Sequence, residues 1–252
     1  MKPAPISIQL YTVREAAAQD PVGTITKVAE AGYTGVELAG MYGMTAKDFR
    51  ALLDQLGLVA SSTHGALPTV ENLEEVVDDA KTIGYKYHIS GWGPPEFATV
   101  ATIVEHAKLA QKAALLLKPY GIKFGIHNHW WEFDHQIAGL YAHELFMAYA
   151  PDVFAEVDTY WTQVAGACAI TAVAKLGCRA PLLHIKDGPG VKEQAMTAVG
   201  KGKMNWPAIV GAASANLQWM VVELDSCDTD MMEAVYDSYA YLVGNGLATG
   251  RK

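Results

Sequence analysis

Short apolar segments alternate with longer amphipathic segments along most of the chain. The short segments are rich in β-branched and aromatic residues and lie between glycine, proline and polar residues, a pattern typical of buried strands. The longer segments repeat apolar residues at helical spacing, and several are followed by a glycine, which commonly ends a helix. The pattern predicts strands at residues 6–10, 35–38, 58–62, 85–90, 123–127, 154–158, 182–186 and 219–223. It predicts helices at residues 23–31, 45–56, 73–83, 100–120, 142–149, 171–176, 206–214 and 230–242.

This alternation predicts the fold class. Eight strand-helix units in 252 residues are typical of one α/β domain whose parallel strands close into a barrel. An open doubly wound sheet would alternate in the same way, but the phosphate-binding motifs GxGxxG and GxxxxGK[ST] are absent from the strand-to-helix turns. We therefore predict a (β/α)8 TIM barrel that forms a single domain over residues 1–252.

Composition and charge narrow the classes of partner. Hydrophobic residues make up 51% of the chain, yet no apolar run approaches the roughly 20 residues of a membrane-spanning helix, so we expect no membrane association. A formal net charge of -8 repels phosphate backbones and disfavours nucleic acid as a partner. The 3 cysteines form no close pair, and the first residues lack a signal-peptide pattern. We expect a cytoplasmic protein.

Polar and aromatic side chains follow nearly every predicted strand. In a barrel of this type the chemistry lies where the strands end at their carboxyl side, so these side chains are expected to converge on one rim. They are Gln9, Glu37, His64, Trp92, His127, His129, Asp158, His184, Lys186, Asp187 and Glu223.

Four residues after successive strands are candidate metal ligands. Glu132 lies in the segment HNHWWEFD, and Asp158, His184 and Glu223 end the sixth, seventh and eighth predicted strands. Three carboxylates and one imidazole suit one divalent ion such as Mn²⁺, Mg²⁺, Co²⁺ or Zn²⁺, with positions left open for substrate oxygens. Because the cysteines do not pair, a thiolate zinc site is not expected.

The chain resembles the sugar phosphate isomerase/epimerase proteins of the xylose isomerase-like barrel superfamily. That group includes inosose dehydratases, ketohexose 3-epimerases and enzymes that process 3-keto-sugars. The matching motifs span most of the chain and read IQLYTVRE, FGIHNHWWEF, EVDTYWTQVAG, LLHIKDG, GKGKMNWPAI and VVELD. The resemblance implies a small sugar or keto-sugar as substrate, one divalent metal ion and a possible homodimer. It also implies Asp158, His184 and Glu223 as metal ligands.

One position departs from the resembled family. In ketohexose epimerases the first metal-binding glutamate lies within the fifth strand, at the place of Gly125 in this chain. Since glycine has no ligating side chain, either Glu132 reaches back to the metal, or His127 or His129 takes that place.

The expected mechanism is proton transfer at a carbon next to a carbonyl. A divalent metal bound to the carbonyl and the adjacent hydroxyl stabilises the enediolate that forms when the proton leaves. With Glu132 and Glu223 on opposite faces of the substrate, one removes the proton and the other returns it, which inverts the carbon. A single base on one face would isomerise the substrate or eliminate water instead.

The remaining rim residues are expected to bind or polarise the substrate. His64, His129 and Lys186 can polarise hydroxyl groups or assist a leaving group, with His127 facing the barrel mouth. Hydrogen bonds to the sugar are expected from Gln9, Glu37 and Asp187, and ring contacts with its C–H bonds from Trp92. A second interpretation of Lys186 and Asp187 is an ion pair that holds the loop.

Three other functions compete with the isomerase or epimerase. A lyase, either an inosose-type dehydratase or an enzyme eliminating from 3-keto glycosides, fits the HNHxxEF segment. An apurinic-site endonuclease has the same barrel but needs a histidine-rich zinc cluster and a basic surface. An inactive sugar-binding barrel would explain the missing glutamate at Gly125.

Overall fold

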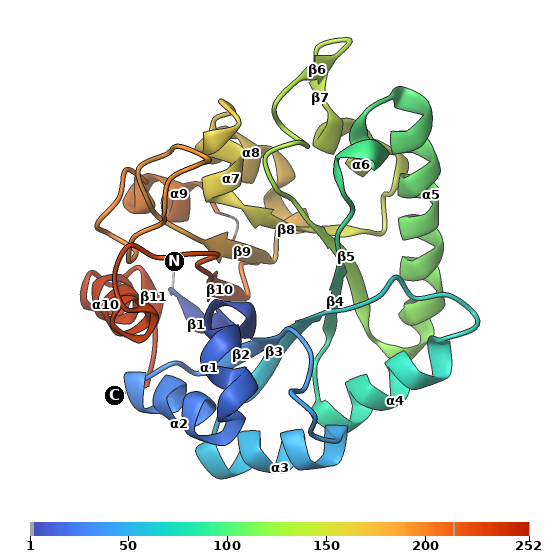
Figure 1. Ribbon diagram of the computed structural model, residues 1–252. Helices are drawn as coiled ribbons and strands as arrows, with labels where there is room; N and C mark the ends of the chain where they lie inside the picture. The colour runs from blue at the N-terminus through green and yellow to red at the C-terminus, as the bar shows by residue number, and fades with distance from the viewer. Residues whose placement is uncertain (1–2, 214, 252) are drawn as a thin grey trace.

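Parallel strands form a closed barrel at the centre of the protein. The computed structural model describes residues 3–213 and 215–251. The strands are β1 (Ala4–Gln9), β2 (Gly35–Leu38), β3 (Val59–His64), β4 (Tyr87–Ser90), β5 (Lys123–His127), β8 (Phe154–Asp158), β9 (Leu182–Ile185) and β10 (Trp219–Val222). Each pairs in parallel with its neighbour, and β10 pairs with β1 to close the ring, with Ile6 opposite Met220. The predicted (β/α)8 barrel is confirmed (Figure 1).

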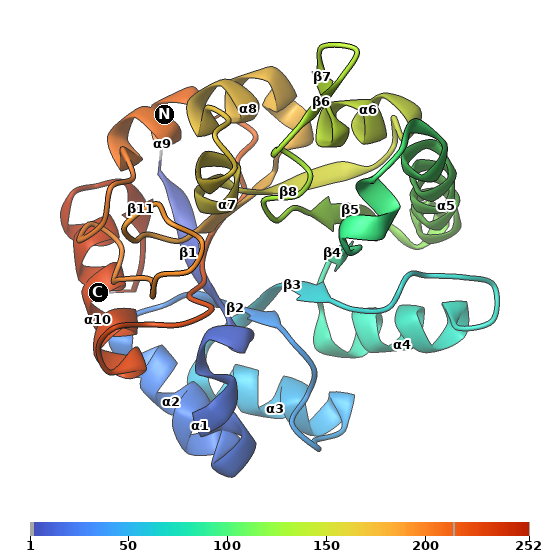
Figure 2. The same cartoon turned by 45° about the horizontal axis from the view of Figure 1, so that its top comes forward.

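Helices surround the barrel on its outside (Figures 1 and 2). The long ones are α2 (Pro21–Ala31), α3 (Ala46–Leu56), α4 (Leu73–Ile83), α5 (Val100–Leu117), α6 (Ala142–Tyr149), α8 (Ala169–Leu176), α9 (Trp206–Ala212) and α10 (Met231–Gly244). Local chemistry sets their ends. The Thr45 side chain accepts a hydrogen bond from the Asp48 backbone at the start of α3, and Gly57 ends the same helix at φ 60°, where glycine carries no Cβ penalty.

The strands read as apolar runs because they are buried on both faces. All four residues of β9 are buried, and so are all five residues of β8. Within β8, Phe154, Glu156 and Asp158 alternate with Ala155 and Val157, so the two acids share one face. That face turns inward, which places two carboxylates inside the barrel near its carboxyl end.

Several short elements escape the sequence pattern. They are α1 (Arg14–Gln19), α7 (Thr159–Val164), the hairpin of β6 (Gln136–Ile137) and β7 (Leu140–Tyr141), and β11 (Ala248–Thr249), which adds to β1 outside the ring. The helix predicted at 100–120 ends as α5 at Leu117, where Pro119 lies in a short 3-10 turn (Lys118–Tyr120). The helix predicted at 206–214 ends at Ala212, and Ser214 lies outside the described residues.

No helix among the described residues has the length and apolar character needed to span a membrane.

Candidate functional site

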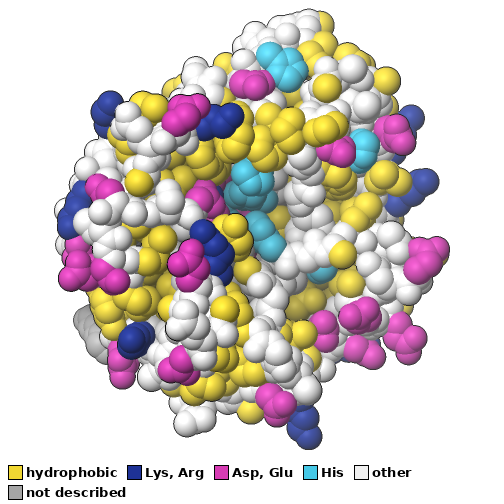
Figure 3. All heavy atoms as spheres, viewed as in Figure 1, with side chains coloured by type: hydrophobic (Ala, Val, Ile, Leu, Met, Phe, Trp, Pro, Cys, Tyr) yellow, Lys and Arg dark blue, Asp and Glu magenta, His cyan; other side chains and the backbone are white. Residues whose placement is uncertain are grey.

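A pocket of about 300 Å³ opens at the carboxyl ends of the strands. Its lining is polar and comes from strands all around the ring, and histidine side chains gather near the centre of the face seen in Figure 3. The lining residues are Gln9, Tyr11, Ala39, His64, Gly91, His127, His129, Lys186, Glu223 and Asp225. The structure therefore brings six residues predicted from the sequence to one place: Gln9, His64, His127, His129, Lys186 and Glu223.

The first of two possible metal-binding groups, here the Asp158 group, consists of His127, Asp158, His184 and Glu223. One ligand atom from each lies within 4.8 Å of the others. His127 Nε2 is 4.0 Å from Asp158 Oδ2, and His184 Nδ1 is 2.8 Å from Glu223 Oε2. The four side chains come from β5, β8, β9 and the end of β10, so the barrel closes around them.

The Lys186 ammonium lies among the carboxylates of this group. Lys186 Nζ is 3.1 Å from Asp158 Oδ2, 2.7 Å from Glu223 Oε2 and 2.8 Å from Asp225 Oδ2. Although burial opposes the charged form, Asp158 and Glu223 raise the pKa of Lys186 well above its usual value. Burial likewise opposes the charge on Glu223, but Lys186 and His184 hold its pKa well below the usual range. Both groups are ionised at neutral pH.

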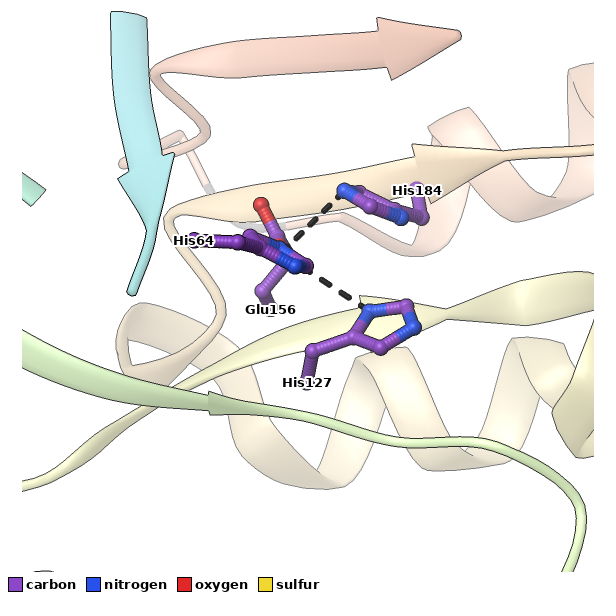
Figure 4. Close-up of side chains that lie close together, drawn as sticks. All are labelled: His64, His127, Glu156 and His184. Atoms are coloured by element: carbon purple, nitrogen blue, oxygen red, sulfur yellow. Dashed lines mark hydrogen bonds and ion pairs between the residues drawn. The ribbon is translucent and has the colours of Figure 1, made fainter. Parts of the chain in front are cut away.

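The second group, here the Glu156 group, consists of His64, His127, Glu156 and His184. The three imidazole rings point toward Glu156 (Figure 4). Glu156 Oε2 lies 2.6 Å from His64 Nε2, 3.1 Å from His184 Nε2 and 3.7 Å from His127 Nδ1. Because Glu156 precedes Asp158 by two residues on β8, the Glu156 carboxylate lies one layer deeper in the barrel.

Burial and neighbouring charges separate the imidazoles into two kinds. Against the effect of burial, Glu156 and Glu37 raise the pKa of His184 well above its usual value, and Glu37 and Glu156 also raise that of His64. Burial together with Lys186 lowers the pKa of His129 to about 3, and burial together with His184 lowers the pKa of His127 well below its usual value. His127 and His129 are therefore neutral at pH 7.

Two buried carboxyl groups bind protons more readily than usual. Burial and the nearby Glu156 carboxylate raise the pKa of Glu37 to about 7. Burial raises the pKa of Asp158 to about 6, against the opposing effect of Lys186.

The sequence of the chain matches a known protein family. The family model of the xylose isomerase-like TIM barrel matches residues 25–237. The chain belongs to this family. The resemblance predicted from the sequence motifs is confirmed.

Solved structures similar to this xylose isomerase-like barrel are distant in sequence. A sugar phosphate isomerase/epimerase from Parabacteroides distasonis ATCC 8503 is 24% identical, with 100% of this chain and 96% of that chain covered and a TM-score of 0.76. An L-ribulose 3-epimerase is 16% identical over 97% of this chain and 94% of its own, with a TM-score of 0.73. The IolI protein with a bound zinc atom is 13% identical over 96% of this chain and 98% of its own, with a TM-score of 0.71. At these identities the similarity establishes the fold, and no curated protein matches the chain.

The structure does not bring Glu132 into either group of this xylose isomerase-like barrel, which corrects its predicted place. Glu132 is fully buried, and its Oε2 accepts a hydrogen bond from the His129 backbone N–H at 2.9 Å. Burial raises its pKa well above the usual value, and the carboxyl group does not line the pocket. His127 lies in both groups instead, which was the alternative left open by the sequence.

Packing explains why this protein has no metal-ligating side chain at position 125. A Cβ built on Gly125 would lie 2.3 Å from Phe154 Cε2, because the Phe154 ring on the neighbouring strand fills that space. His127, two residues further along β5, is the next side chain on the same face.

Asp187 and Trp92 are also placed differently from the prediction. The Asp187 carboxylate is fully buried and accepts hydrogen bonds from four donors of the following loop, the backbone N–H groups of Gly188, Gly200 and Met204 and the indole N–H of Trp206. It does not pair with Lys186 and has no oxygen left for a sugar. Trp92 packs on Phe146 and His106 and does not line the pocket.

Glu37, by contrast, lies directly beneath the pocket. Its Oε1 accepts a hydrogen bond from Gln9 Nε2 at 2.7 Å and lies 2.7 Å from His184 Nε2. Its carboxylate is thus engaged by protein groups, and it holds Gln9 and His184 in place.

The sequence analysis missed three residues of the site. Tyr11 and Asp225 line the pocket, and Glu156 lies at the centre of the Glu156 group. For Glu156 a signal was present: an acidic residue in the middle of an apolar strand, two positions before Asp158 and therefore on the same face.

Proposed function

We propose that this protein is an enzyme that isomerises or epimerises a small sugar or keto-sugar with the help of one divalent cation at the Asp158 group. The observation that supports this most is the convergence of two imidazoles, two carboxylates and the Lys186 ammonium beside one pocket. The pocket volume of about 300 Å³ suits one small polar molecule. The sugar phosphate isomerase/epimerase and the L-ribulose 3-epimerase among the similar structures favour the same substrate class.

The donors of the Asp158 group fit a divalent cation. Imidazole nitrogen and carboxylate oxygen are common ligands of Zn²⁺, Co²⁺ and Mn²⁺. Asp158 Oδ2 is buried and lies 3.1 Å from the Lys186 ammonium, so this oxygen already faces a positive charge at the place where a cation would bind. His127, Asp158, His184 and Glu223 would hold the ion. When bound, it would stabilise the negative charge that develops on substrate oxygens as a proton leaves carbon.

Glu223 is the base in this proposal. Its carboxylate lines the pocket and is kept ionised by Lys186 and His184, so it can accept a proton from the carbon next to the substrate carbonyl. His129 lines the pocket from the loop after β5 and is neutral, so it can accept a proton on another side of the substrate. Glu132 does not line the pocket, so it is not assigned a role in proton transfer.

The other lining residues position the substrate. The Lys186 ammonium can donate hydrogen bonds to a carbonyl or hydroxyl oxygen, and it stays charged among its three carboxylates. His64 and Gln9 face the same space and can bind sugar hydroxyls. These groups would fix the substrate carbonyl relative to Glu223, which is a large part of the rate enhancement in proton transfer.

Elimination is the second candidate reaction, and the position of Glu132 favours it. Glu132 does not line the pocket; among the described residues the lining carboxylates are Glu223 and Asp225, and Asp225 is paired with Lys186. One carboxylate base on one face would remove a proton, and the Lys186 ammonium could protonate a leaving hydroxyl. This is the chemistry of a lyase.

The two reactions are separated by the mass of the product. The cation-loaded protein is incubated with a panel of aldoses, ketoses and 3-keto-sugars in D₂O, and the products are analysed by mass spectrometry and NMR. Deuterium at the carbon next to the carbonyl without loss of mass supports isomerisation or epimerisation, whereas loss of one water supports elimination. Glu223→Gln should abolish either reaction with an unchanged circular dichroism spectrum, and the variant Glu74→Gln, at an exposed position, should keep it. Turnover retained in Glu223→Gln would remove this residue from the mechanism, and a panel without exchange or product would count against the proposed function.

A further inference from the structure

Another pocket, here the α6–α8 pocket, lies on the outside of the barrel between α6 and α8. Its volume of about 340 Å³ is within the range of pockets that bind small molecules. The two helices follow each other around the barrel, beside the hairpin of β6 and β7 (Figure 2). Among the described residues, none lines both this pocket and the one at the carboxyl ends of the strands. The α6–α8 pocket is therefore separate from the candidate catalytic site.

Small side chains leave this space open. Ala148 on α6 and Ala172 on α8 line the pocket, together with Ala167 from the segment between α7 and α8. An ion pair connects the two helices, in which Lys175 Nζ lies 2.7 Å from Glu144 Oε1, and both residues line the pocket. A larger side chain in place of an alanine would occupy the space, so one substitution can close the pocket.

The lining is mainly apolar and includes two aromatic rings. The ring centroids of Phe133 and Tyr141 are 5.5 Å apart, and the Phe133 ring is also stacked on the His143 ring. Met147 and Leu176 add apolar side chains from α6 and α8. Such walls favour a ligand with an aromatic body over a sugar, because the hydroxyl groups of a sugar would lose their hydrogen bonds with water.

One polar side chain of the lining has no partner within the described part of the chain. His143 lines the pocket with 1% of its surface exposed, and its Nε2 is buried without a hydrogen-bond partner. Burial and, against the effect of Glu144, the charge of Arg179 lower the pKa of His143 to about 4, so its ring is neutral at pH 7. A neutral imidazole carries one ring proton, which Nε2 can donate to an acceptor on a ligand.

The charged side chains of the lining sum to one positive charge. Lys175 is paired with Glu144, whereas Arg179 forms no ion pair with a carboxylate among the described residues. The Arg179 guanidinium donates instead to the backbone oxygens of Met147, Ala150 and Val153, which carry no net charge. A ligand with a single negative charge would balance this half-buried cation.

The uncompensated charge lies near the unpaired histidine nitrogen. Arg179 Nη2 is 3.8 Å from Met147 Sδ, and Met147 follows His143 by about one helical turn on α6. One oxygen anion at this end of the pocket could therefore accept a hydrogen bond from His143 and interact with the charge of Arg179. The apolar walls would then surround the rest of the ligand.

We propose that the α6–α8 pocket binds a small aromatic monocarboxylate, whose carboxylate accepts a hydrogen bond from His143 and whose rings pack against Phe133 and Tyr141. The aromatic body matches the apolar walls, and the single negative charge matches the net charge of the lining. The proposal does not depend on which reaction the pocket at the carboxyl ends of the strands performs.

Isothermal titration calorimetry of the purified protein with 2-naphthoate tests the site. We expect 2-naphthoate to bind with a dissociation constant below about 1 mM, and the neutral 2-naphthamide of similar shape to bind at least about tenfold more weakly. Ala172→Leu fills the pocket and should abolish binding, and Ala148→Leu fills it from α6 and guards against a folding defect in the first variant. Ala174→Leu is the matched control, because Ala174 is an exposed residue of α8 outside the lining, and it should bind as the wild type does.

The variant His143→Phe keeps an aromatic ring but has no Nε2. It should weaken the binding of 2-naphthoate by about tenfold. If Ala172→Leu and Ala148→Leu both bind 2-naphthoate as tightly as the wild type, or if the wild type binds neither compound, the proposed site is wrong. Equal affinities of the wild type for 2-naphthoate and 2-naphthamide would overturn the assignment of a carboxylate ligand.

Discussion

Replacing Asp187 tests whether this residue binds substrate or holds the structure together. Its Oδ1 accepts hydrogen bonds from the backbone N–H groups of Gly188 at 2.9 Å and Met204 at 3.1 Å. Its Oδ2 accepts from the Gly200 N–H and the Trp206 indole N–H, both at 2.9 Å. The substitution Asp187→Asn conserves the shape but replaces one of the two oxygens with an NH₂ group.

The expected loss of stability follows from these contacts. The new NH₂ group would face two N–H donors, so two hydrogen bonds to a charged acceptor are lost and two buried donors stay unsatisfied. At about 1.5–3 kcal/mol for each such bond, Asp187→Asn should lower the free energy of unfolding by roughly 3–6 kcal/mol. Asp187→Ala leaves all four donors unsatisfied and should be at least as severe.

Urea unfolding followed by circular dichroism measures this change directly. Asp237→Asn is the matched control, because Asp237 is an exposed acid paired with Lys201, and its loss should change the free energy by no more than about 0.5 kcal/mol. If Asp187→Asn unfolds within about 1 kcal/mol of the wild type and binds sugars less tightly, the structural role argued here is wrong.

Three further changes follow from the same structure. Burial lowers the pKa of His143 to about 4, so between about pH 6.5 and pH 4 the unfolded chain binds a proton that the folded chain does not. The free energy of unfolding should therefore fall by roughly 3 kcal/mol as the pH is lowered across this window. An equally steep fall in the variant His143→Gln would contradict this prediction. Gly125→Ala should cost about 1–3 kcal/mol because its Cβ meets the Phe154 ring, while Gly211→Ala, with open space around its Cβ, should not destabilise the protein. Lys186→Met leaves buried carboxylates without their ammonium partner, so the free energy of unfolding of the cation-free variant should be about 3–5 kcal/mol lower than that of the wild type. Mn²⁺ should raise the melting temperature of the variant more than that of the wild type, and an equal rise in both would contradict this prediction.

The barrel could be predicted from the sequence because its signal is local. Strands buried on both faces read as apolar runs, and the predicted ranges for β2, β5 and β8 coincide with Gly35–Leu38, Lys123–His127 and Phe154–Asp158. The side chains after these strands converge because the closed ring brings all carboxyl ends to one rim. For this reason Asp158, His184 and Glu223 could be grouped without coordinates.

The residues that were misplaced depend on contacts that no local pattern carries. Glu132 lies close to His127 and His129 in sequence, but its carboxyl group is buried, accepts a hydrogen bond from the His129 backbone N–H and does not line the pocket. Asp187 was read as a substrate ligand because its partners, such as Trp206, are contributed by a long loop. The homodimer and the cytoplasmic location stay predictions.

The pairing of β10 with β1 makes the pocket at the carboxyl ends of the strands one of the last parts of the molecule that can form. Glu223 and Asp225 follow β10, while His64 belongs to β3, so the pocket-lining side chains meet only through contacts between distant parts of the chain, which form slowly. As the chain leaves the ribosome, the histidines of β3 and β5 emerge well before Glu223 and form only a partial chelator. An ion bound at that stage would lack its carboxylate ligand from the last strand. Secure retention of the proposed ion would therefore be tied to ring closure, and it would distinguish finished barrels from nascent chains.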